Sequence, residues 1–186
     1  MNGIKSLSDE DLFREFLKEN KSEAYFREIL QRFKQKVYWQ IRRLLMSHDD
    51  ADEVCQIVFI KLWKNAEQFK FNSKLSSFIF RIAYNESMTF IKSQKRFSSL
   101  DVSEEGLRKL ESRIEDELMP ESSEIEKQFF AALLTLPEKQ RLVFNYRYFE
   151  EMSYTDISEI TGTSEGGLKA NYHIAVEKLK KFLVKD

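Results

Sequence analysis

The chain has 186 residues, 42% of them hydrophobic but only 5 Gly and 2 Pro, which favours long helices around a buried core and argues against a turn-rich all-β fold. A net charge of −1 with a pI near 6.2 excludes a uniformly basic nucleic-acid-binding surface, although acids concentrate between residues 101 and 126 and leave both flanks net positive. The single Cys excludes a disulfide framework, and without a charged-then-apolar leader or a bilayer-length apolar run we expect a cytoplasmic protein with no membrane insertion.

Capping signals and apolar periodicity predict three helices in the first third of the chain. Ser8 and Asp11 form a capping box before a short helix, and a longer helix follows from Ser22. The third helix is expected from about Ala51 to Phe69, with His48 to Asp50 as the break before it. Its outer face mixes acidic, amide and aliphatic side chains, which suits docking against another protein's helices. The alternative is an ordinary solvated face.

A short polar loop with two lysines, Lys70 to Lys74, precedes a fourth helix that Ser76 or Ser77 can cap. Basic groups interleaved with aromatic residues next to a loop suit opened or single-stranded DNA, because lysines pair with phosphates and aromatic faces stack on bases. The alternative is that Phe78 and Phe80 of this helix are simply core residues.

Apolar periodicity weakens between Ser98 and Ser123, a stretch that also holds most of the excess acids. It predicts an acidic flexible linker at residues 98–126, which joins two small helical domains at residues 1–97 and 127–186. Further helices are expected from Glu124 and from Pro137, so the predicted fold class is all-α.

The end of the chain predicts a helix-turn-helix. Ser153 and Asp156 form a capping box before a short helix, and Gly162 can adopt the left-handed conformation that ends it. Thr163 or Ser164 can then cap a second, longer helix with polar and basic residues near its start, the geometry of a recognition helix in a major groove. The alternative is an ordinary helical hairpin. The buried stripe expected on the second helix is Leu168, Tyr172, Ala175 or Val176, Leu179 and Phe182.

Two stretches of the chain, roughly residues 25–96 and 129–183, resemble RNA polymerase sigma factors of the extracytoplasmic-function (ECF) type. DADEVCQIVFIKLW (50–63) is similar to the family's polymerase-binding segment, and FKFNSKLSSFIFRIAYN (69–85) to its promoter-melting segment. LPEKQRLVFNYRYFEEMSYTDISEITGTSEGGLKANYHIAVEKL (136–179) is similar to its reader of the upstream promoter element. The resemblance implies a transcription initiation factor without catalytic activity or cofactor. Its implied partners are the RNA polymerase core enzyme, promoter DNA and an anti-sigma factor.

The resemblance also implies three sets of site residues. The core polymerase would be contacted by Asp52, Glu53, Gln56, Ile57 and Ile60. The minus-10 element would be contacted by Asn72, Ser73, Lys74, Phe78, Arg81, Asn85 and Lys92. The minus-35 element would be contacted by Ser164, Glu165, Gly166, Lys169, Asn171, His173 and Lys178.

Three positions depart from the family pattern. Phe78 stands where many members have Trp, Ile57 where an acid is frequent, and Asn171 where Arg is common. Because Asn pairs well with adenine edges whereas Arg favours guanine, we expect a minus-35 site that is less guanine-directed at Asn171.

Three rival functions predict different behaviour. A helix-turn-helix regulator would bind duplex DNA tightly without polymerase, whereas a sigma factor should need the core enzyme. An enzyme is disfavoured because the only histidines, His48 and His173, are far apart in the sequence, and no Walker loop, HExxH, CxxC or nucleophile elbow is present. A helical scaffold would explain the bundle pattern but not the residues from Ser164 to His173.

Overall fold

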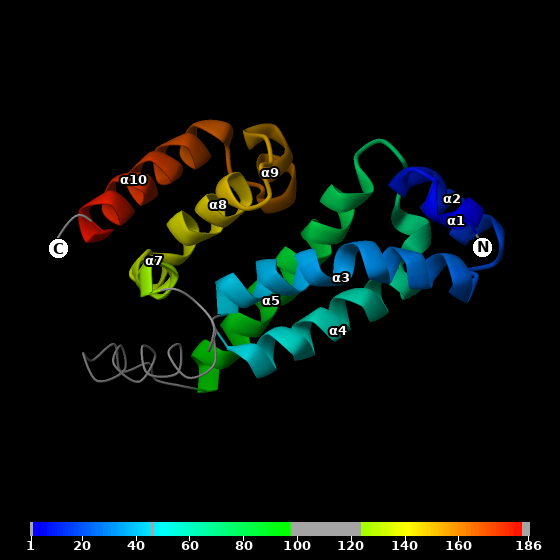
Figure 1. Ribbon diagram of the computed structural model, residues 1–186, viewed down its shortest axis with the longest axis horizontal. Helices are drawn as coiled ribbons and strands as arrows, with labels where there is room; N and C mark the ends of the chain where they lie inside the picture. Colours follow the sequence, from blue (N-terminus) through cyan, green and yellow to red (C-terminus); the bar gives the residue numbers. More distant parts are fainter. Residues whose placement is uncertain (1, 46, 98–123, 184–186) are drawn as a thin grey trace. The chain divides into compact units, whose positions relative to one another are not determined.

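The computed structural model describes residues 2–45, 47–97 and 124–183, and every regular element within these ranges is a helix (Figure 1). The all-α class predicted from the low Gly and Pro content is therefore confirmed. The chain divides into two compact units, residues 1–91 and 92–186. The predicted acidic linker lies outside the described residues except for its last three, which begin a helix. Within the described ranges, no helix combines the length and apolar character needed to cross a bilayer.

The N-terminal unit is built around two long helices that pack side by side, α3 and α4 (Figure 1). Helix α2 packs against α3, and its start is fixed by Ser8, whose hydroxyl accepts a hydrogen bond from the Asp11 backbone N–H as the capping box predicts. The elements of this unit are α1 (Asn2–Lys5), α2 (Asp9–Lys18), α3 (Glu23–Leu45), α4 (His48–Lys64), the 3₁₀ turn η1 (Ala66–Gln68) and α5 (Leu75–Phe97).

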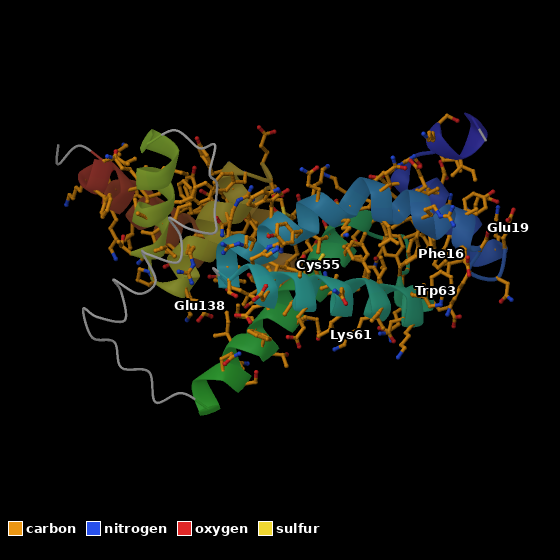
Figure 2. All side chains as sticks on the ribbon, turned by 60° about the horizontal axis from the view of Figure 1, so that its bottom comes forward. Phe16, Glu19, Cys55, Lys61, Trp63 and Glu138 are labelled. Atoms are coloured by element: carbon orange, nitrogen blue, oxygen red, sulfur yellow. The ribbon has the colours of Figure 1, made fainter. Side chains whose placement is uncertain are left out.

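Aromatic side chains fill one end of this unit. Figure 2 shows Phe16 and Trp63 close together there, and their ring centroids are 5.3 Å apart. Phe26 meets Trp63 edge to face at 4.8 Å, and Phe13 meets Phe69 in the same way at 5.4 Å. Such pairs add to the apolar burial, so this cluster ties α2, α3, α4 and the segment after η1 into one core.

The third predicted helix has different bounds from those expected. Helix α4 begins at His48 rather than Ala51, because the Ser47 hydroxyl caps it by accepting from the Asp50 backbone N–H at 3.3 Å. The acids read as a break are therefore its first turn, where they favour the positive end of the helix dipole. Helix α4 ends at Lys64, and η1 follows before Phe69.

The expected serine cap of the fourth helix is wrong. Helix α5 begins at Leu75, ahead of both serines, and Ser77 is buried at 2% exposure. The Leu75 backbone N–H instead donates to the Glu10 carboxylate of α2 at 2.9 Å. This cap comes from a residue too distant in sequence for a local pattern to reveal.

The C-terminal unit is a smaller helical bundle. Its elements in the described residues are α7 (Glu124–Leu134), α8 (Glu138–Tyr148), α9 (Tyr154–Thr161) and α10 (Glu165–Leu183). Helix α10 packs against the other three elements. The centre of the core is formed by Ala132, Leu133, Leu136, Phe144, Ala175 and Leu179.

Local capping sets the geometry of the helix-turn-helix as predicted. The Ser153 hydroxyl accepts from the Asp156 N–H at 3.0 Å, and Gly162 ends α9 with a φ of +69°. The Ser164 hydroxyl accepts from the Gly167 N–H at 3.3 Å, which makes it the cap of α10. The predicted buried stripe fails only at its end, where Phe182 is 42% exposed because α10 extends past the core.

Candidate nucleic-acid and polymerase interfaces

The outer face of α4 gathers the residues predicted to contact the polymerase. Helical spacing places all five on one side of the helix, with Asp52, Glu53, Gln56 and Ile60 exposed and Ile57 half-buried. Ile60 is 53% exposed, which is unusual for a large aliphatic side chain. The face therefore offers carboxylates around an apolar contact point.

This face opens into a groove that the sequence did not reveal. The groove has a volume of about 420 Å³ and lies between α3 and α4, where Leu30 and Lys34 of α3 meet Asp52, Gln56 and Ile60 of α4. The apolar pattern of α3 placed Leu30 in the buried stripe, but it is only half-buried and forms the groove floor. Its position directly after the buried Ile29, at the edge of the stripe, was the available signal.

Tyr38 of α3 lies close to His48 and Asp52 at the start of α4. The Tyr38 hydroxyl lies 2.7 Å from His48 Nδ1, and His48 Nε2 lies 3.6 Å from the Asp52 carboxylate. Burial raises the pKa of Tyr38 above its usual value, so the phenol stays neutral. His48 therefore lies between Tyr38 of α3 and Asp52 of its own helix.

The loop before α5 presents the first predicted minus-10 residues to solvent. Asn72 and Lys74 are exposed and Ser73 is half-exposed. Phe71, just before them, has a φ of +57°, a left-handed conformation that a non-glycine residue rarely adopts. This bend turns the chain outward at Asn72.

A stripe on α5 continues from the loop. Phe78, Arg81, Asn85 and Lys92 are spaced by three, four and seven residues, which aligns them on one side of the helix. Arg81, Asn85 and Lys92 are exposed, and Phe78 is half-buried with its ring 5.2 Å from Phe69. The core alternative holds for Phe80, which is 4% exposed. The loop and the stripe together form one basic and aromatic surface.

The start of α10 gathers part of the predicted minus-35 set. Ser164, Gly166, Lys169 and His173 are exposed, and helical spacing places the last three on one side with Glu165. Gly166 has open space where a side chain would begin, so a backbone can approach closely.

Glu165 holds the two helices of the helix-turn-helix together. Its carboxylate accepts from the Thr155 hydroxyl of α9 at 2.8 Å and lies 3.4 Å from Lys169 Nζ. The hydrogen bond from Thr155, then that from Lys169, lowers the pKa of Glu165. The family resemblance implies only a DNA contact for Glu165, whereas this geometry adds a contact between α9 and α10.

Two predicted minus-35 residues lie on a different side of α10. Helical spacing turns Asn171 and Lys178 well away from Lys169 and His173. Asn171 is half-buried, and its amide donates to the Gly167 carbonyl at 2.9 Å. Lys178 is exposed near the far end of the helix. The seven residues thus form one compact group and two outliers.

Within the described part of the chain, no group of three or more His, Cys, Asp or Glu side chains is arranged to hold a metal ion. Cys55 is buried in α4, and burial raises the pKa of its thiol from 9.0 to about 11.

Both units match family models. A model described as sigma-70 region 2 matches residues 29–97, and one described as sigma-70, region 4 matches residues 126–179. The ECF RNA polymerase sigma factor SigW of Bacillus subtilis is 31% identical over 158 residues, which cover 81% of this chain and 84% of that protein. The ECF RNA polymerase sigma-E factor of Haemophilus influenzae is 28% identical over 156 residues, covering 80% and 82%.

A solved structure shares the fold. The sigma factor RpoE from Bartonella quintana, in complex with the anti-sigma factor NepR, aligns with a TM-score of 0.69 at 21% identity over 87% of this chain and 98% of that chain. The two family models follow one another along the chain in the order that the sequence resemblance implies. The chain therefore belongs to the ECF family of RNA polymerase sigma factors, which are transcription initiation factors and not enzymes.

Proposed function

We propose that this sigma factor places three separate surfaces against three targets when it directs the RNA polymerase core enzyme to a promoter. The α3–α4 groove and the outer face of α4 bind the core enzyme. The loop at residues 69–74 and the α5 stripe bind the opened minus-10 element, and the start of α10 reads the minus-35 element. The single observation that carries this proposal is that most residues of each implied set lie together on one exposed surface, with Asn171 and Lys178 as the exceptions.

The proposed polymerase contact centres on Ile60. An aliphatic side chain that is 53% exposed, beside the Asp52 and Gln56 groove wall, offers a partner helix an apolar anchor with a polar rim. We expect Ile60→Asp to weaken binding of the core enzyme by about tenfold or more, since a charge at an apolar anchor is left desolvated. Lys36→Ala, at an exposed position of α3 that helical spacing turns away from Leu30 and Lys34, is the control, and affinity is measured by fluorescence anisotropy. If Ile60→Asp binds the core enzyme with unchanged affinity, Ile60 is not part of the polymerase contact.

The proposed minus-10 contact supplies binding energy for DNA opening. Flipping a base costs a few kcal/mol, and a stacking contact returns about 1–3 kcal/mol per base. Phe78 provides an aromatic edge beside the loop, and Lys74 and Arg81 supply positive charge for phosphates. Opening therefore requires no nucleotide hydrolysis.

The proposed minus-35 contact uses the first turns of α10 in the major groove. Lys169 and His173 share the exposed side, whereas Asn171 lies on a different side of the helix. In a binding-site selection with reconstituted holoenzyme, we expect less guanine preference at the base nearest Asn171. A guanine requirement that disappears in Asn171→Ala would contradict this expectation.

Promoter selectivity is tested by run-off transcription on a library of candidate promoters. We expect specific transcripts only when this chain and the core enzyme are both present. A helix-turn-helix regulator would instead bind duplex DNA alone and give no core-dependent initiation.

We also propose a cytoplasmic location, where polymerase and promoters are found, and an anti-sigma factor as a partner. The solved relative from Bartonella quintana is in complex with such a factor. Recovery of an inhibitory protein that competes with the core enzyme for this chain would support the partner, whereas its absence under every growth condition would argue against it.

A further inference from the structure

Helix α2 and the turn after it contact the proposed minus-10 loop, residues 69–74, at both of its flanks. Before the loop, Lys21 Nζ lies 3.2 Å from the Glu67 carboxylate in η1. After the loop, the Leu75 backbone N–H donates to Glu10 Oε1 at 2.9 Å. Both contacts join residues that are far apart in the sequence.

Helix α2 also contacts the middle of the loop. Phe13, which is fully buried, meets Phe69 edge to face at 5.4 Å and lies 6.4 Å from Phe71. The Arg14 guanidinium carbon sits 4.9 Å from the centre of the Phe71 ring. Phe71 has the unfavourable φ of +57°, which persists only where surrounding contacts fix it. These contacts come from one helix.

Helix α2 is itself anchored to α3. The Arg32 guanidinium lies 2.8 Å from the Asp9 carboxylate and donates to the Leu7 carbonyl at 2.9 Å and the Lys5 carbonyl at 3.0 Å. Such charge-assisted bonds hold the chain on both sides of the helix start. The position of α2, and with it the position of Glu10, is therefore set by the long α3 helix.

The first turn of α5 needs a cap that its own sequence does not provide. Lys74 precedes the helix and carries no side-chain acceptor, and helix α5 begins ahead of the two serines. The Glu10 carboxylate supplies the acceptor and places a negative charge at the positive end of the α5 dipole. Without it, the half-buried Leu75 N–H loses this partner and the adjacent Lys74 loses its fixed position.

We propose that Glu10 is a positioning residue for minus-10 recognition, which holds loop 69–74 in its DNA-binding conformation through the Leu75 N–H. The proposal rests on the proposed function of this loop. The sigma-70 region 2 match begins at residue 29, so α2 lies outside it. Glu10 does not touch DNA in this proposal and acts only through the loop.

The test uses holoenzyme reconstituted with full-length variants. The probe is a fluorescent single-stranded oligonucleotide with the non-template minus-10 sequence of the strongest promoter in the run-off library. We expect Glu10→Ala to weaken probe binding about tenfold, as loss of a charge-assisted hydrogen bond allows. Glu10→Asp should weaken it comparably because its carboxylate is one methylene shorter, and Glu10→Gln should retain most of the affinity because it keeps an acceptor oxygen.

Three further measurements separate positioning from general destabilisation. Glu15→Ala, on the same helix but directed at Lys18, is the matched control and should bind the probe normally. Affinity for the core enzyme and for minus-35 duplex should stay unchanged in every Glu10 variant. Hydrogen exchange of the Leu75 amide should accelerate in Glu10→Ala and Glu10→Asp but not in Glu10→Gln.

Asn72→Ala and Lys74→Ala distinguish failure of this inference from failure of the proposed function. If neither variant weakens probe binding, the loop is not the minus-10 contact. If they weaken it while Glu10→Ala and Glu10→Asp bind normally, the loop function stands and the positioning role of Glu10 is overturned. An equal loss of core binding in the Glu10 variants would also overturn it. Should Glu10→Ala fail to fold, Glu10→Asp alone decides the outcome.

Discussion

The two units position their candidate DNA-contacting residues by different physical means. In the C-terminal unit, the Ser153 cap, the left-handed Gly162 and the Ser164 cap are all local, and they fix where α9 ends and α10 begins. In the N-terminal unit, loop 69–74 is bent against its own preference at Phe71 and is held by Glu10, which is distant in the sequence. The start of α10 is thus specified by its neighbours in the chain, whereas the conformation of loop 69–74 depends on the surrounding core.

The positions of the tryptophans allow the stability of the two units to be measured separately. The chain has 2 Trp, and both Trp39 and Trp63 lie within residues 1–91. Tryptophan fluorescence therefore reports unfolding of the N-terminal unit, while helical circular dichroism reports both units. A change that acts on one unit alone should separate the two signals.

The largest expected effect comes from the aromatic core. Phe16 is fully buried against Phe13, Phe26 and Trp63, so Phe16→Ala should lower the free energy of unfolding of the N-terminal unit by about 3–5 kcal/mol. Urea titration followed by tryptophan fluorescence measures the loss. Phe182→Ala, at a 42% exposed position of α10, should leave the fluorescence midpoint unchanged. Equal shifts from both variants would mean that the two units unfold as one.

The next effect concerns the reactivity of the only cysteine, Cys55, in the N-terminal unit. Its thiol pKa is raised from 9.0 to about 11 by burial, so at about pH 8 the thiolate population is roughly a hundredfold lower than for an exposed thiol. Alkylation by iodoacetamide, followed by mass spectrometry, should be slow in the folded protein and fast in urea. Because the folded pKa is raised, the stability linked to this thiol is present below about pH 9 and is lost as the pH rises toward 11. Rapid alkylation of the folded protein would show that the α3–α4 packing opens.

The difference between local contacts and contacts distant in the sequence also explains which features could be predicted. The all-α fold and both capping boxes rest on local patterns, and the structure contains them at the predicted residues. The cap of α5 was assigned to Ser76 or Ser77 because only nearby oxygens can be recognised in a sequence. The actual acceptor, Glu10, lies 65 residues earlier in the sequence, and no local pattern connects it with α5.

The candidate surfaces show a similar limit. Asp52, Glu53, Gln56 and Ile60 are exposed, as helical spacing predicts. The periodicity of one helix is enough to tell its outer face from its buried face. The groove next to this face required two helices to be placed together, so Leu30 and Lys34 were missed. On α10, Asn171 was expected to face outward with Lys169 and His173, but it is half-buried and its amide donates to the Gly167 carbonyl.

A smaller effect is expected from the turn of the helix-turn-helix. Gly162 has a φ of +69°, and an added Cβ would meet no atom within 4 Å, so the cost of Gly162→Ala is conformational alone. We expect a loss of about 1–2 kcal/mol in the C-terminal unit, measured by circular dichroism in urea, with no change in the fluorescence midpoint. Gly162→Asn should cost less because Asn tolerates this conformation. Gly166→Ala, within the helix and equally open, should be neutral or stabilising. If Gly166→Ala lowered the stability of the C-terminal unit as much as Gly162→Ala, the cost could not be due to the left-handed backbone conformation of Gly162.

The smallest effect tests the hydrogen bond between Thr155 of α9 and Glu165 of α10. Thr155→Val removes the hydrogen bond to Glu165, the first cause of the lowered pKa of that carboxyl. Because the folded pKa lies below the usual 4.5, the stability it contributes is present above about pH 4.5 and is lost as the pH falls through the folded pKa. The melting temperature of Thr155→Val should therefore be slightly lower than that of the native chain near pH 7, and the difference should vanish in acid. Glu159→Gln, which changes an exposed acid of α9, is the control, and its melting temperature should not show a difference from the native chain that disappears in acid. A difference that persists in acid would assign the effect to packing of the Thr155 methyl group and not to the carboxylate.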